Sequence, residues 1–208
     1  MFPIIEFFLI SYLIGSIPTA YIAVRKKSHI DIRSAGSGNV GTMNAYEVTG
    51  SRVVGIFVLA GDVVKGAGAV LLAARLPDSG EAVIAASFIG VVLGHCYPVW
   101  LKFRGGRGLA PAAGAMLILS WPFVAMWLVW WIAGYSIVRN IHLGNAAAIV
   151  ATPLVGWMLP SGLISKYMES SFTSTQFLSV FTLVSALLLA RHAEPIRELF
   201  WPSTKNGT

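Results

Sequence analysis

An all-α protein that crosses a membrane several times is predicted from three features of this sequence. Of its 208 residues, 56% are hydrophobic and only 12% are charged, and the mean hydropathy is +0.72. A soluble domain of this size carries far more charge. Apolar runs alternate with polar segments, and Lys and Arg gather in every second segment. Since no linker, repeat or low-complexity stretch divides the chain, we expect one domain over residues 1–208, with about seven transmembrane helices.

The apolar runs are the candidate transmembrane helices. Several reach the roughly 20 residues that a helix needs to cross about 30 Å of hydrocarbon. The first run is expected to stay in the membrane, because the segment MFPIIE before it has no cation and Arg25, Lys26 and Lys27 follow it. The runs are 4–24, 53–76, 81–101, 109–119, 121–138, 143–160 and 176–190.

Positive charge predicts the orientation of these helices. If all the runs cross, twelve of the fifteen Lys and Arg lie on one side of the membrane. Cytoplasmic loops carry such an excess, so we expect the N-terminus outside, the C-terminus in the cytoplasm, and cytoplasmic loops at 25–52, 102–107 and 139–142. The net charge of +6 follows from this asymmetry. No basic tract with interleaved aromatic residues points to a nucleic-acid partner.

Metal binding is not expected from this sequence. Cys96 is its one cysteine, which excludes an intramolecular disulfide and a site with several cysteine ligands. The ligand spacings HExxH and CxxC are absent as well.

The segment GSGNVGTMN, residues 36–44, is a small polar stretch between two apolar runs. Its glycines allow positive φ and close approach of a ligand, and successive N–H groups in such a turn form a nest for an anion. Ser37, Asn39 and Asn44 add neutral donors. A phosphate suits this lining, although many glycine-rich loops are only turns.

A second glycine-rich segment, GHCYPVWLKFRGGRG, covers residues 94–108. Lys102, Arg104 and Arg107 surround Gly105 and Gly106 there. Cations at a membrane surface often contact lipid headgroups, which explains Lys102 and Arg104 but not the glycine pair. Two loops of this kind on one face predict a site for two phosphates, or for a ligand with two anionic ends.

Further polar residues lie at the predicted cytoplasmic ends of the apolar runs. His95, His142 and His192 fall at one depth, and each is either a structural hydrogen-bonding group or part of the site. Asp62 and Lys65 are three residues apart inside the second run, so they share a helix face. They form either a buried ion pair or a site in which Lys65 reaches an anion.

These motifs resemble those of a known family. GSGNVGTMN, GHCYPVWLKFRGGRG and RHAEPI, in this order, are similar to the signature loops of the PlsY family of acyl-phosphate:glycerol-3-phosphate acyltransferases, as are Gly15–Ser16 and the D-x-x-K-G pattern at 62–66. The resemblance implies a seven-helix enzyme of the bacterial inner membrane, with its active site facing the cytoplasm. It implies transfer of a fatty acyl group from acyl phosphate to the 1-hydroxyl of glycerol 3-phosphate. It implies neither a metal or other cofactor nor an obligate protein partner; the partners expected are the two substrates and membrane lipid.

The resemblance also assigns roles to residues. Together with the positive charge of the second loop, the resemblance implies that the catalytic residues are Ser37, Arg107 and His192. Glu194 would support the histidine. The residues expected to bind substrate are Gly36, Gly38, Asn39, Asn44, Lys65, His95, Lys102, Arg104, Gly105, Gly106, His142 and Arg191.

Three positions depart from the family pattern. Glu47 stands where an arginine is usual, Pro195 where an asparagine is usual, and His142 near a usual serine. We expect Glu47 to turn away from the site and to pair with a cation such as Arg52, while Arg107 and His142 supply the missing donors.

The sequence leaves the proton acceptor and two rival functions open. The H-x-x-x-x-D pattern of soluble acyltransferases is absent. The hydroxyl proton then goes to a substrate phosphate, which we favour, or to His192. The rivals are an anion transporter and a family member that binds ligand without catalysis. Clustering of the polar loops on one predicted face argues against transport.

Overall fold

A computed structural model describes residues 2–77 and 80–200 of the chain, and the regular structure in these ranges is entirely helical. The all-α prediction is therefore confirmed. The elements are α1 (Phe2–Ser16), α2 (Thr19–Ser28), η1 (Ile32–Ser34), α3 (Thr42–Thr49), α4 (Arg52–Ala74), α5 (Glu81–Cys96), η2 (Val99–Leu101), α6 (Leu109–Val138), α7 (Ile141–Met158), α8 (Ser161–Ser165) and α9 (Ser174–Phe200).

Six helical segments within the described ranges are long and apolar enough to cross a membrane. The sequence predicts about seven because it separates the runs 109–119 and 121–138, which both fall in α6. Ser120 interrupts α6 with φ −169° and ψ 93°, and Pro122 follows it. Two helical segments therefore meet at Ser120. The chain is a multi-pass membrane protein, and its orientation remains a prediction.

The first apolar run is also divided in the structure. α1 ends at Ser16, and α2 begins at Thr19 after Pro18, whose φ of −89° and ψ of 69° are not helical. Proline lacks the backbone N–H and disfavours the helical conformation of the residue before it. The break exposes backbone carbonyl groups inside an apolar segment, and one of them becomes part of the site.

Two compact units make up the described chain. One extends to Ser120 and includes Glu169–Phe172; the other contains Trp121–Met168 and the chain from Thr173 onward. The expectation of a single domain over residues 1–208 remains a prediction.

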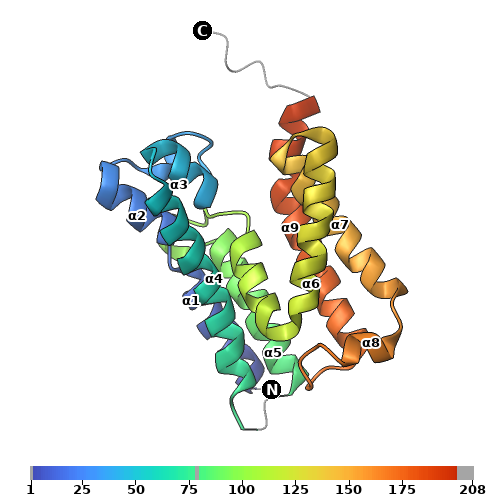
Figure 1. Ribbon diagram of the computed structural model, residues 1–208. Helices are drawn as coiled ribbons and strands as arrows, with labels where there is room; N and C mark the ends of the chain where they lie inside the picture. The colour runs from blue at the N-terminus through green and yellow to red at the C-terminus, as the bar shows by residue number, and fades with distance from the viewer. Residues whose placement is uncertain (1, 78–79, 201–208) are drawn as a thin grey trace. The chain divides into compact units, whose positions relative to one another are not determined.

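In the first unit, α1, α4 and α5 pack side by side (Figure 1). The contact of α1 with α5 depends on small residues, which let transmembrane helices approach closely. A Cβ at Gly94 would collide with the Tyr12 carbonyl oxygen. Ser11 and Ser87 hydrogen-bond across the same contact at 2.6 Å.

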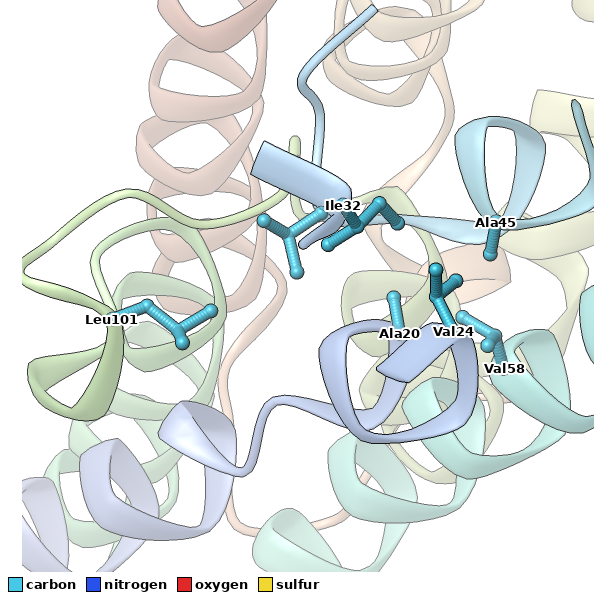
Figure 2. Packing of buried hydrophobic residues seen from close by; sticks show 7 residues of the cluster. Ala20, Val24, Ile32, Ala45, Val58 and Leu101 are labelled. Carbon is cyan, nitrogen blue, oxygen red and sulfur yellow. The ribbon is translucent and has the colours of Figure 1, made fainter. Parts of the chain in front are cut away.

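A small apolar cluster lies at the α2 and α3 end of this unit. Figure 2 shows that it joins α2, α3, α4, η1 and η2. Val40 and Leu101 belong to the two glycine-rich segments, and both are buried. The apolar cluster therefore supports both glycine-rich loops on α2 and α4. Its members are Ala20, Val24, Ile32, Val40, Ala45, Val58 and Leu101.

The second unit is held by aromatic contacts and by packing of α7 and α8 on α9. Phe123 meets Phe177 and Phe181 edge to face, with ring centroids 5.0 and 5.4 Å apart. The Trp157 indole donates to the Thr182 hydroxyl at 3.1 Å. Many large apolar side chains of both units stay exposed, as expected of helices that face lipid.

Candidate functional site

The first glycine-rich loop lies between η1 and α3. Gly36 and Gly38 have φ of 56° and 69°, the left-handed region that glycine adopts without strain. A Cβ at Gly36 would also collide with the side-chain oxygen of Asn44. The loop therefore needs glycine at position 36 for both its conformation and its packing.

Asn44, in the first turn of α3, holds this loop together. Its side chain is buried, and its Oδ1 accepts a hydrogen bond from the Ser37 N–H at 3.0 Å. Its Nδ2 lies 3.2, 3.1 and 2.9 Å from the carbonyl oxygens of Ile32, Ala35 and Asn39. Three acceptors share two amide hydrogens, so no donor remains for a ligand. The geometry assigns Asn44 to shaping the loop, whereas the sequence suggests a direct contact with substrate.

Ser37 is exposed at the tip of the loop. Its N–H is bound to Asn44, while its hydroxyl has no hydrogen-bond partner within the described residues. Asn39 is half-buried beside it. The Ser37 hydroxyl is therefore available to donate to an anion or to a developing oxyanion.

The second glycine-rich loop follows α5 and η2. Gly105 and Gly106 are buried against protein. A Cβ at Gly105 would collide with the His95 carbonyl oxygen, and one at Gly106 would collide with the His95 imidazole and lie 2.7 Å from the Val40 carbonyl oxygen. The glycine pair therefore allows the two loops to pack together on the end of α5. Contact of the glycine pair with a substrate remains a prediction.

The cations of the second loop differ in exposure. Lys102 and Arg104 are exposed, which also fits contact with lipid headgroups, and Arg107 is half-buried. Lys102 and Phe103 have positive φ, 54° and 61°. The Phe103 N–H donates to Pro98 O at 3.0 Å and holds this turn.

Arg33, which is not among the site residues predicted from the sequence, connects the two loops. Its guanidinium donates to Asp31 at 2.6 and 3.0 Å and to the Leu101 carbonyl oxygen at 3.4 Å, and it lies 5.4 Å from the Tyr21 ring centroid. The hydrogen bonds from Arg33 to the Asp31 carboxylate lower the pKa of Asp31 from 3.8 to about 2. The sequence signal is the D-x-R spacing just before the first loop.

A buried ion pair lies next to the loops. Lys65 Nζ is 2.9 Å from Asp62 Oδ1 and donates to the Ile17 carbonyl oxygen at 3.1 Å, in the break between α1 and α2. His95 Nδ1 is 3.7 Å from the same carboxylate oxygen. The sequence leaves open whether Asp62 and Lys65 form an ion pair or Lys65 reaches an anion. The structure contains the ion pair. Lys65 also supplies a partner for a carbonyl that the helix break exposes.

Three predicted site residues belong to the second unit. The Asn140 side chain caps α7 by accepting from the His142 N–H at 2.9 Å. His192 is fully buried in α9, and its Nδ1 lies 2.7 Å from the Leu188 carbonyl oxygen. Because a carbonyl only accepts, Nδ1 carries a proton, and Nε2 is the basic nitrogen of the neutral ring. Arg191 is half-buried beside it. The expectation that these residues meet the glycine-rich loops remains a prediction.

Glu47 and Pro195 are two of the departures noted in the sequence. Glu47 is exposed on α3, and within the described residues it forms no ion pair with Arg52. The expected pairing is therefore wrong. Both side chains are exposed. Pro195 is buried inside α9. Across residues 2–77 and 80–200, no group of three His, Cys, Asp or Glu side chains could hold a metal.

The fold and this site define a multi-pass helical membrane protein with two glycine-rich loops joined beside a buried ion pair. The chain belongs to the glycerol-3-phosphate acyltransferase family, whose sequence model matches residues 5–201. Similar curated proteins include glycerol-3-phosphate acyltransferases of Syntrophotalea carbinolica, 36% identical over 92% of this chain and 91% of that protein, and of Nitrobacter winogradskyi, 38% identical over 93% and 90%.

Two solved structures similar to this chain are of an enzyme with the same activity as the family's name gives. The crystal structure of PlsY (YgiH), an integral membrane glycerol 3-phosphate acyltransferase, in its glycerol 3-phosphate form, matches with a TM-score of 0.80 at 27% identity. The match covers 95% of this chain and 92% of that one. The lysophosphatidic acid form matches with a TM-score of 0.78.

Proposed function

We propose that this protein transfers a fatty acyl group from acyl phosphate to the 1-hydroxyl of glycerol 3-phosphate, forming lysophosphatidate and phosphate. The observation that carries the proposal is family membership over nearly the whole chain. The structural neighbour in glycerol 3-phosphate and lysophosphatidic acid forms supports the acceptor and the product. The exposed Ser37 hydroxyl in an Asn44-supported loop suits a phosphate or an oxyanion.

The chemistry needs positioning more than activation. Acyl phosphate is a mixed anhydride, so the glycerol oxygen attacks its carbonyl carbon, the bond from that carbon to the phosphate oxygen breaks, and phosphate leaves. Ser37 donates to the developing oxyanion or to a phosphate, and Arg107 stabilises phosphate charge. The hydroxyl proton goes to a substrate phosphate; His192 Nε2 is the alternative acceptor within the protein.

We further propose that the site faces the cytoplasm from the bacterial inner membrane. When 109–119 and 121–138, the two helical segments that meet at Ser120, are counted as separate crossings, twelve of fifteen Lys and Arg lie on one side of the membrane, and cytoplasmic loops carry this excess. Both glycine-rich loops belong to that side. An acceptor that is a soluble dianion could then reach the site without crossing the bilayer.

The test uses purified full-length protein in detergent, with palmitoyl phosphate and glycerol 3-phosphate as substrates. We expect lysophosphatidate from palmitoyl phosphate and none from palmitoyl-CoA. Ser34→Ala is a matched control for variants of Ser37, because the Ser34 hydroxyl already donates to the Asp31 carbonyl oxygen. Binding of glycerol 3-phosphate without any product would contradict the proposal and favour a family member that has lost catalysis.

A further inference from the structure

A small polar cavity lies between the α1–α2 break, α4 and the end of α5, beside Val40 of the first glycine-rich loop. Its volume is about 10 Å³, which holds one water-sized group. Its polar lining residues are Ser16, Thr19, Asp62, Lys65 and His95.

The cavity contains hydrogen-bonding groups that lack partners among the described residues. Ser16 is fully buried, and its hydroxyl makes no hydrogen bond there. The Lys65 ammonium has three hydrogens; it donates one to the Ile17 carbonyl oxygen and forms an ion pair with Asp62, so at least one hydrogen remains. Buried polar groups are almost always paired in folded proteins, by protein atoms or by ordered water.

Size and charge together select the missing partner. Lys65 and Asp62 neutralise each other, and the space accepts a single oxygen-sized group, so a phosphate dianion fits neither the charge nor the volume. We propose that the cavity binds one neutral O–H group, which accepts from Lys65, bonds the Ser16 hydroxyl and donates to Asp62. Water needs a site of about this volume with two to four polar partners, and the cavity offers them.

Two sources have this chemistry: a resident water molecule and a hydroxyl of the acceptor substrate. The second source rests on the proposed function. In both cases the bound O–H group lies beside Val40 and His95, the residues that contact Gly106. The bound group therefore packs against the residues through which the two glycine-rich loops meet.

The direct test is a pair of crystal structures of the full chain, with and without glycerol 3-phosphate. We expect density for one oxygen within hydrogen-bond distance of Ser16 Oγ and Lys65 Nζ. Its presence without substrate identifies water, and its appearance only with glycerol 3-phosphate identifies the substrate. A dry cavity in both structures would overturn the proposal. Water density requires no turnover, so this outcome is independent of the proposed activity.

Variants distinguish the sources in solution. Ser16→Ala is compared with Ser11→Ala, a buried serine of the same helix whose hydroxyl is already paired with Ser87. For a substrate hydroxyl, we expect Ser16→Ala to raise KM for glycerol 3-phosphate about fivefold or more while Ser11→Ala leaves it unchanged. For a structural water, Ser16→Val, which fills the space, keeps KM and changes Tm. Unchanged KM and Tm in both Ser16 variants would contradict the proposal.

Discussion

Asn44→Ala is expected to loosen the first glycine-rich loop without unfolding the helices around it. The substitution removes the acceptor of the Ser37 N–H, at 3.0 Å, and two amide hydrogens that three backbone carbonyl oxygens share at 2.9 to 3.2 Å. A net contribution near 1 kcal/mol for each of these three hydrogens gives about 3 kcal/mol, and water entering at the exposed side of the loop lowers this to about 2–3 kcal/mol.

Hydrogen exchange measures this loss directly, because the change is local. A loss of about 2–3 kcal/mol corresponds to amide exchange about 30- to 150-fold faster in the loop. We expect that increase in a peptide covering residues 33–46, by mass spectrometry on protein in detergent. The KM for glycerol 3-phosphate should rise as well, because Ser37 loses its fixed position.

Two further variants make the result specific. Thr49→Ala removes hydrogen bonds at the other end of α3 and should leave exchange in the loop unchanged. Asn44→Asp keeps an acceptor for the Ser37 N–H but directs a carboxylate at three carbonyl oxygens, so it should loosen the loop at least as much as alanine. Loop exchange within threefold of wild type in Asn44→Ala would refute the supporting role of this residue.

Three other predictions follow from the site. Gly106→Ala places a methyl group against the imidazole beneath it, so it should lower Tm and raise KM for glycerol 3-phosphate; Gly68→Ala, with open space around it, should do neither. Asp31→Asn removes a carboxylate whose pKa is lowered by Arg33, so it should destabilise by at most about 1 kcal/mol at pH 7, the side chain being about a third exposed. That difference should disappear as pH falls from 4 towards 2, because protonation then removes the ion pair from wild type; a pH-independent difference in Tm would count against it. Ser37→Ala should reduce kcat about 100-fold or more, and no acyl-enzyme is expected in either the wild type or the variant. An acyl group on Ser37 in mass spectra of wild type would contradict its role as a donor.

Several features could be predicted from sequence because they depend on residues close together in the chain. Apolar runs about as long as a membrane is thick predict helices that cross it, and the described helices follow those runs. The three-residue spacing of Asp62 and Lys65 places them on one helix face, and they form an ion pair there. Glycine clustering likewise marks the segment in which Gly36 and Gly38 have positive φ.

Other features depend on neighbours that are far apart in the chain. Arg33 reaches the Leu101 carbonyl oxygen and Lys65 reaches that of Ile17, and backbone acceptors of this kind have no signature in the sequence. Gly106 is required because a histidine and a carbonyl oxygen of two other segments lie against it. The sequence by itself determined the helices, the membrane class and the two loops, since these follow from local composition and spacing. Only the tertiary structure decided which groups shape the loops and which are left to meet a ligand, because that depends on which donors and acceptors folding brings together.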